Sequence, residues 1–494
     1  MIENIKKIAF IFILPLPWLW PISFGPWAEA IPWLFSLAVA AIIMVVWPVS
    51  EDNVTTDIAT AFAIGAVISV FPEIIQYFGL SSLEIFWPWI RDTAPGVSIG
   101  NIGQPNQQAT LLAIGLISTY WIYCHRRISL PAFLAASTLI SIGIALSASR
   151  TGALYLLCVP FISWWIFKSD KKIFFCYIFA CFFFYVLTSL AAPYIANSIG
   201  IENAKSVFIR IIGIGSSCES RSILWGNVIE LISQKPWQGW GWNNLRYAQY
   251  ITDFESPRLC SVLGNAHNIP LHFAVTLGIP ITIFICSIAI YFFIKLTPWK
   301  ETNPKKRYLW AVLIPIGIHS MLEFPLWYGP FQIISAICIY LIIKQKTNPI
   351  GFKKNTAIRY CVSVSVMALS LWVFIDYQRV TQVYLPPDLR VEELKTDSSL
   401  EKSIIYSSKT IFFSDQSNFA TVIFINPDKN NSLIINKLAN NLLHFSPEPR
   451  VIKRLLESAL IIGDTDQYNL HKKRFEITYP KEYLKWLESE SANN

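Results

Sequence analysis

The chain has 494 residues, of which 53% are hydrophobic and only 15% are charged, and its formal net charge is +8. Soluble globular proteins carry about one quarter charged residues, so this composition and a mean hydropathy of +0.44 exclude an ordinary soluble enzyme and indicate a membrane protein. Lys and Arg fall in short segments between apolar runs, a pattern that argues against a nucleic-acid partner and makes the charge informative about topology.

Apolar runs long enough to cross a lipid bilayer as helices recur along the chain up to residue 376. A spanning helix needs about 17–25 such residues, and about eleven runs meet that length. We therefore predict an all-α fold, a polytopic helical bundle in a bacterial inner membrane. The predicted spans are residues 8–24, 28–48, 57–80, 107–124, 129–148, 151–167, 173–195, 269–295, 308–326, 330–343 and 358–376.

The basic segments predict the orientation of the bundle. If every run crosses the bilayer, these segments fall on one side, which the positive-inside rule assigns to the cytoplasm. Residues 81–106, the long loop 196–268 and everything after about residue 377 then face the periplasm. The first run resembles a cleavable signal, but its length favours an uncleaved helix. The basic segments are Lys6-Lys7 and residues 125–127, 168–172, 295–307 and 344–354.

Three regions follow from this reading. Residues 1–80 are N-terminal transmembrane helices, and residues 81–376 are a catalytic membrane domain that includes the loop 196–268. Residues 377–494 carry charges throughout and contain helix-periodic segments at 432–443 and 448–461, so they predict a soluble helical domain in the periplasm. This last domain could either dock an acceptor or support the membrane domain.

The nine cysteines predict a disulfide and no metal site. They include no Cys-x-x-Cys pair and no Cys/His cluster, and most of them lie in or beside apolar runs, where Cys behaves as a small hydrophobe. Cys218 and Cys260 differ because both lie in the outward loop, where thiols oxidise. We expect these two residues to form a disulfide.

Three ionisable residues are predicted at the outer membrane boundary, where an unpartnered charge costs free energy. Arg150 lies in a tight turn between two spans, Arg221 opens an amphipathic helix, and His267 precedes the span that begins near residue 269. Taken singly, each has a plain alternative: an interfacial anchor, a solvated charge and a surface histidine, respectively. Together on one face, two guanidiniums can grip a diphosphate bidentately and an imidazole can take a proton from a hydroxyl.

The residues around these positions carry a resemblance to a known family. The turn Ser149-Arg150-Thr151-Gly152, the Arg-x-x-x-Trp helix that starts at Arg221, and Ala266-His267-Asn268 resemble the Wzy-C superfamily of O-antigen ligases and bacterial O-oligosaccharyltransferases. Within it, residues 100–106 (Gly-Asn-Ile-Gly-Gln-Pro-Asn) and 323–328 (Glu-Phe-Pro-Leu-Trp-Tyr) are similar to the PglL/PilO-type protein glycosylation branch. The resemblance covers roughly residues 90–345.

The resemblance implies transfer of a preassembled oligosaccharide from undecaprenyl diphosphate to Ser or Thr hydroxyls of exported proteins such as pilin, with inversion and without a metal or other cofactor. His267 would be the catalytic base, and Arg150 and Arg221 would bind the diphosphate. The sequence shows no obvious carboxylate cluster for a divalent ion, in agreement with metal independence. Gln104 and Tyr328 match polar positions of the branch and would orient donor or acceptor, or be a plain loop amide and an interfacial tyrosine.

Other residues and other functions stay open at this point. Glu323 could bind substrate or form a structural ion pair with an arginine, and Trp237, Trp240 and Trp242 could stack on sugars or anchor at the interface. The same donor site would serve an O-antigen ligase, whose acceptor is lipid A-core, or a glycan polymerase. A lipid-glycan transporter is disfavoured because charges deep within the spans and related halves of the chain are not seen, and a scaffold that displays the tail leaves the three ionisable residues without a common purpose.

Overall fold

The computed structural model describes residues 2–47, 53–168, 170–212, 218, 220–344, 356–395 and 399–493, and these residues form helices and no strand. Most of the predicted basic segment 344–354 lies outside the described residues. The chain divides into two compact units. The bundle unit comprises Met1–Ser23, Glu29–Ile214 and Phe292–Ser370, and the loop-tail unit comprises Phe24–Ala28, Gly215–Tyr291 and Leu371–Asn494.

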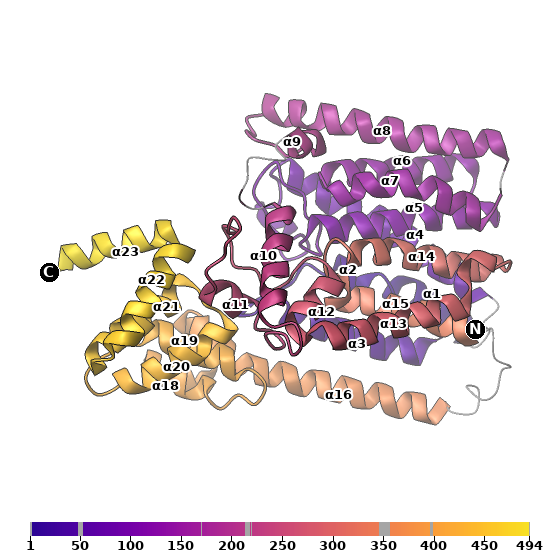
Figure 1. The fold of residues 1–494 in the computed structure, drawn as a ribbon. Helices are drawn as coiled ribbons and strands as arrows, with labels where there is room; N and C mark the ends of the chain where they lie inside the picture. Colours follow the sequence, from indigo (N-terminus) through magenta and orange to yellow (C-terminus); the bar gives the residue numbers. More distant parts are fainter. Residues whose placement is uncertain are drawn as a thin grey trace. The chain divides into compact units, whose positions relative to one another are not determined.

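The bundle unit is built from long apolar helices, several of which run side by side in Figure 1. Every residue of α5 from Gln107 to Ile122 is buried, because α4, α6, α7 and α14 all pack against this helix. Gly115 lets α4 approach closely, since a Cβ there would collide with Ala66. The helices of this unit are α1 (Ile2–Ile13), α2 (Leu16–Leu19), α3 (Ala30–Val46), α4 (Val54–Tyr77), α5 (Pro105–Cys124), α6 (Leu130–Leu146), α7 (Arg150–Ile166), α8 (Lys171–Ser198), α9 (Val207–Ile212), α14 (Pro304–Ser320), α15 (Gly329–Lys344) and most of α16 (Thr356–Thr381).

Four helices of the described residues are long and apolar enough to cross a membrane. They are Val54–Tyr77, Lys171–Ser198, Ile279–Lys300 and Ala357–Tyr384, and four shorter apolar helices accompany them. Large apolar side chains of α8 such as Phe175, Phe179 and Leu190 are exposed, which is expected of a surface that lipid covers. The chain is therefore a membrane protein.

Two of the predicted spans are interrupted. The run 8–24 is split into α1 and α2, because Pro15 and Pro17 lack the backbone N–H that a continuous helix needs. The run 269–295 is split into α12 (Ile269–Leu277) and α13 (Ile279–Leu296). Gly278 forms the break with φ of 86°, and a side chain there would collide with the carbonyl of Trp237.

The loop-tail unit joins the long loop to the C-terminal tail. The tail helices predicted at 432–443 and 448–461 are found as α20 and α21, which pack together as a hairpin. The helices of the unit are α10 (Arg221–Gln234), α11 (Leu245–Ile251), α12, most of α13, the end of α16, α17 (Glu392–Lys395), α18 (Leu400–Ser407), α19 (Ser414–Phe424), α20 (Ser432–Phe445), α21 (Pro449–Ile462), α22 (Thr465–Thr478) and α23 (Pro480–Asn493).

Loop and tail share one hydrophobic core. Tyr250 of α11 is fully buried among tail residues that include Val422, Leu455 and Phe475. Its hydroxyl lies 3.0 Å from Nδ1 of His471 on α22, and Arg258 of the loop donates to the Thr478 hydroxyl at 3.0 Å. The tail therefore holds the loop that carries His267.

The buried histidine of this contact makes the unit sensitive to pH. His471 is only 5% exposed, and burial, with the nearby charge of Arg474, lowers its pKa to about 4 from 6.5. As pH falls from about 6.5 toward 4, the unfolded chain takes up a proton that the folded unit does not, so up to about 3 kcal/mol of stability is lost. We expect the hydrogen-exchange protection factors of α11 and α22 to fall over this window by more than in His471→Gln, whose amide does not titrate. An identical pH dependence of the two proteins would contradict the assignment.

Candidate active site

Arg150 is placed by a capped turn between α6 and α7. Ala148 adopts a left-handed backbone with φ of 47°, and the buried Ser149 caps α7 by accepting from the Gly152 amide at 3.0 Å. Arg150 is the first residue of α7 and is exposed. Its guanidinium thus stands at the positive end of a helix dipole, where an anion is favoured.

A chain of side-chain hydrogen bonds ties this turn to Glu323. The Ser149 hydroxyl donates to Oδ1 of Asn106 at 2.6 Å, and Nδ2 of Asn106 donates to the Glu323 carboxylate at 2.9 Å. Glu323 is buried just beyond the end of α14, where its backbone N–H bonds the His319 carbonyl. The side-chain amide of Asn106 is thus a structural hydrogen-bond partner for at least one carboxylate oxygen of Glu323.

Gln104 begins α5 on the same unit. It is the N-cap residue, and its side-chain oxygen accepts from the Gln107 amide at 2.6 Å. The segment before it is fixed by Gln76 of α4, whose side chain bonds the backbone of Arg91, Ile99 and Gly100. The position of Gln104 is therefore fixed by hydrogen bonds both in the segment before it and in the helix after it.

Tyr328 lies in the turn before α15 and is half-buried. Burial is the main cause of a raised pKa of about 12; the charges of Glu29 and Glu323 act in the same direction, and a hydrogen bond with Gln107 and the charge of Arg91 oppose them. The phenol consequently keeps its proton at neutral pH. A neutral hydroxyl beside the start of α5 can donate to or accept from a substrate oxygen.

Two arginines that the sequence analysis missed belong to the same unit. Arg210 of α9 donates to the Ala148 carbonyl at 3.0 Å and so contacts the turn that carries Arg150. The guanidinium of Arg91 lies over Gly103, whose φ of 83° favours glycine. No motif marked either residue; Arg210 inside the apolar run Val-Phe-Ile-Arg-Ile-Ile was the only available signal.

In the loop-tail unit, one hydrogen bond brings the helix of Arg221 to the turn of His267. Trp225 lies one helical turn after Arg221 on α10, and its indole N–H donates to the Ala266 carbonyl at 3.0 Å. His267 follows with φ of 51°, and its amide donates to Asn265 Oδ1 at 3.0 Å. Asn268 then caps α12. Arg221 and His267 thus lie on two segments that a hydrogen bond joins directly.

The tryptophans after α10 separate into two kinds. Trp240 is committed to the fold, because its indole donates to the Leu231 carbonyl at 2.9 Å, its amide bonds Val275 of α12, and Lys235 lies 3.9 Å above its ring. Trp237 and Trp242 are 75% and 55% exposed. Trp242 packs against His272 and Phe273, but both exposed rings are more accessible to a sugar than that of Trp240.

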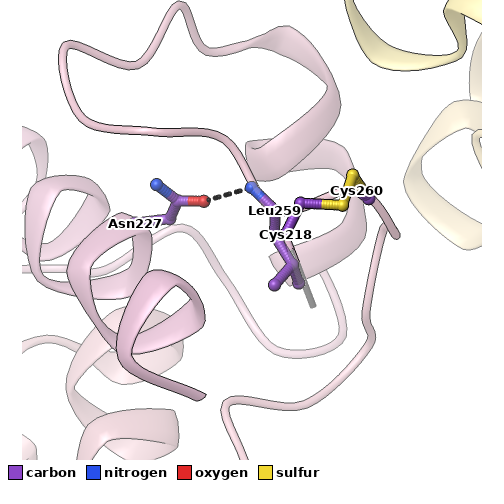
Figure 2. Close-up of a disulfide and its surroundings, with 4 residues drawn as sticks. All are labelled: Cys218, Asn227, Leu259 and Cys260. Carbon is purple, nitrogen blue, oxygen red and sulfur yellow. Dashed lines mark hydrogen bonds between the residues drawn. A yellow bond between two sulfur atoms is a disulfide. The ribbon is translucent and has the colours of Figure 1, made fainter. Parts of the chain in front are cut away.

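Cys218 and Cys260, the pair predicted from topology, are joined by a disulfide with a Cα–Cα distance of 5.5 Å. Figure 2 shows this bond beside a second link between the same segments, in which the Leu259 amide donates to Asn227 Oδ1 at 3.0 Å. Asn227 also donates to the Pro257 carbonyl at 2.9 Å. The disulfide and this asparagine hold the loop against the start of α10, where Arg221 lies.

The predicted site residues are thus distributed over the two units. Arg150, Gln104, Glu323 and Tyr328 lie in the bundle unit, at or beside the ends of α5, α7, α14 and α15. The loop-tail unit holds Arg221, His267 and the disulfide.

Family models match three successive parts of the chain. The model described as "Protein glycosylation ligase" matches residues 99–123, which contain Gln104 and Asn106. The model "O-Antigen ligase" matches residues 135–286, which contain Arg150, Arg221 and His267. Over these residues the chain is similar to the Wzy-C superfamily. A third model of the superfamily, "Virulence factor membrane-bound polymerase, C-terminal", matches residues 307–493 and so includes the tail.

Two relatives from Acinetobacter baylyi are similar to the chain. It is 26% identical over 331 residues to a general O-oligosaccharyltransferase, covering 63% of this chain and 55% of the relative. It is 25% identical over 350 residues to a ComP-specific O-oligosaccharyltransferase, covering 68% of this chain and 60% of the relative. The matched part therefore spans little more than half the length of these relatives.

The bond from Trp225 to Ala266 predicts a local effect of mutation. Trp225→Phe keeps the aromatic packing and removes the indole N–H, so the turn 264–268 should open more often, and its amides should exchange about fivefold faster. Hydrogen exchange measured by mass spectrometry tests this. Trp240→Phe is the matched control because it removes an equivalent indole bond elsewhere and should leave the turn 264–268 unchanged. Unaltered protection in Trp225→Phe would show that the bond does not hold the turn.

Proposed function

We propose that this protein is a glycosyltransferase that moves a preassembled oligosaccharide from undecaprenyl diphosphate to Ser or Thr hydroxyls of exported proteins such as a pilin. The observation that carries the proposal is the bond between Trp225 and Ala266, which joins the helix of Arg221 to the turn of His267. A cation and an imidazole carried on segments joined by a hydrogen bond suit the displacement of a diphosphate by a hydroxyl. The reaction is placed at the periplasmic face of the inner membrane, as the positive-inside rule predicts.

In the proposed step, His267 accepts the proton of the acceptor hydroxyl while the oxygen of that hydroxyl attacks the anomeric carbon of the donor sugar. The new bond forms between that oxygen and the anomeric carbon, and the bond from this carbon to the diphosphate oxygen breaks. The leaving diphosphate keeps the bonding electrons, and the charges of Arg150 and Arg221 stabilise it. Attack from the face opposite the leaving group inverts the anomeric centre, and this step uses no metal ion.

The remaining predicted residues have proposed roles in binding. Tyr328, whose phenol stays protonated at neutral pH, and Gln104 at the start of α5 would orient donor or acceptor. Trp237 and Trp242 are the exposed rings on which sugar faces could stack. Glu323 would affect substrate binding indirectly, because its hydrogen bond to Asn106 helps to hold the turn that carries Arg150.

The nearest alternative functions differ from the proposed one in the molecule that accepts the glycan. A protein acceptor is supported by the glycosylation-ligase match over residues 99–123. A glycan polymerase is favoured by one observation, the match of residues 307–493 to the C-terminal part of a membrane-bound polymerase. An O-antigen ligase would use the same donor and lipid A-core as acceptor.

The function is tested by co-expressing the chain with a lipid-linked glycan pathway and a candidate pilin. The wild-type protein should add the mass of the glycan to the pilin, and His267→Ala should abolish that shift while the protein still inserts into the membrane. His125→Ala is the matched control, since His125 is also half-buried but lies in a predicted cytoplasmic segment. A fully active His267→Ala protein refutes the role of His267, and longer glycan chains without modified protein would favour the polymerase.

Bidentate recognition of the diphosphate is tested by Arg150→Lys, which keeps the charge and removes the planar fork. The concentration of lipid-linked donor needed for half-maximal transfer should rise roughly ten- to a hundredfold, the value of one or two charge-assisted hydrogen bonds. Arg127→Lys, at an exposed arginine of the predicted cytoplasmic side, should behave as wild type. An unchanged donor requirement in Arg150→Lys would leave Arg150 as an interfacial anchor.

A further inference from the structure

Asn106 is the last residue of the motif 100–106 and has no role in the proposed transfer step. It lies in the first turn of α5 and contacts two buried groups that are far from it in the chain, Ser149 and Glu323. Ser149 is fully buried and Glu323 is 5% exposed. Removing the amide between them would leave both groups short of a partner inside the protein, which is costly.

The bonds of Asn106 have one consistent direction. The Glu323 carboxylate carries no proton when ionised, so Asn106 must turn its NH₂ group toward it, across 2.9 Å. The Asn106 oxygen then faces Ser149, whose hydroxyl donates to it across 2.6 Å. The same hydroxyl oxygen accepts from the Gly152 amide at 3.0 Å. Each group in the series therefore determines the donor or acceptor role of the next.

The series ends at the residue before Arg150. Because Ser149 is the N-cap of α7, its position determines where the backbone of Arg150 begins. One turn further along α5, Thr110 lies 2.9 Å from the Tyr155 hydroxyl of α7 and 2.9 Å from Nδ1 of His319 on α14. Asn106 and Thr110, one helical turn apart on α5, therefore each contact α7 or its N-cap on one side. On the other side, Thr110 contacts α14 and Asn106 contacts the turn that follows α14.

We propose that Asn106 is a positioning residue for donor binding, which sets the Arg150 turn through Ser149 and is itself oriented by Glu323. The proposal rests on the proposed function, because Arg150 must bind the diphosphate for its position to matter. Asn106 acts through Ser149 and need not touch the substrate. Its loss should accordingly raise the donor concentration needed for half-maximal transfer.

An exchange of the amide and the carboxylate tests the proposal. Asn106→Asp alone places two carboxylates against each other, so the half-maximal donor concentration should rise by about tenfold or more. Glu323→Gln alone keeps an acceptor oxygen for Asn106 and is the reference for the exchange. The double variant Asn106→Asp/Glu323→Gln restores donor and acceptor in reversed order, and its half-maximal donor concentration should lie within about threefold of that of Glu323→Gln.

A second arm separates positioning from general stability. In an Arg150→Lys background the fork that Asn106 positions is absent, so Asn106→Ala should add less than about threefold to the donor requirement, whereas it should add about tenfold in the wild-type background. Asn436→Ala, which removes an asparagine that bridges Ser458 and Gln467 in the tail, is the matched control and should not change the donor requirement. Thermal unfolding of each variant shows whether it is folded.

The outcomes are distinguishable. If the wild-type chain transfers glycan but the double variant stays as impaired as Asn106→Asp, or Asn106→Ala costs the same in both backgrounds, the inference about Asn106 is wrong and the proposed function stands. If the wild-type chain neither transfers glycan nor binds the lipid-linked donor, the proposed function fails and the inference fails with it. Should Asn106→Asp not fold, the comparison of Asn106→Ala in the two backgrounds decides.

Discussion

Helix N-termini are the constraint on which this site depends. The first amides of a helix have no partner within it, and at the edge of an apolar bundle they must be capped. Ser149 and Ser220 cap α7 and α10, and the residue that follows each cap is Arg150 or Arg221. Gln104 caps α5, and Asn268, the neighbour of His267, caps α12. The residues proposed for chemistry are therefore held by the same bonds that complete the helices, and the positive helix ends favour a diphosphate.

Much of the fold could be predicted from apolar runs, because a bilayer sets the length of a spanning helix. Apart from 8–24 and 269–295, which are split, each predicted span coincides largely with one described helix, and α20 and α21 lie within two residues of the segments predicted from their periodicity. The breaks at Pro15 and Gly278 were not predicted, although Pro and Gly were visible, because average hydropathy does not register one missing N–H or one left-handed residue. The union of loop and tail depends on Tyr250 packing against residues some two hundred positions later, and no local pattern encodes such a contact.

The site residues also divide into those that the sequence predicted and those that it did not. Arg150, Arg221 and His267 stood out because ionisable groups next to apolar runs are rare and costly, and the disulfide followed from the side of the membrane assigned to its cysteines. Arg210 did not stand out, and Asn106 and Trp225 belonged to the quoted motifs without a role of their own, since an amide, an indole or a guanidinium gains its role only from a partner elsewhere in the chain. Glu323 was visible as a buried acid, but its bond to an amide was not expected.

The central claim is a division of labour, in which the guanidiniums bind the donor and the imidazole performs the proton transfer. It is tested most directly by measuring, with native mass spectrometry of the purified protein, how tightly each variant binds undecaprenyl-diphosphate-linked glycan in the absence of acceptor. The account predicts that His267→Ala binds the donor as tightly as the wild type, whereas Arg150→Ala and Arg221→Ala bind it at least about tenfold more weakly. Loss of donor binding in His267→Ala, or undiminished binding in both arginine variants, would contradict it.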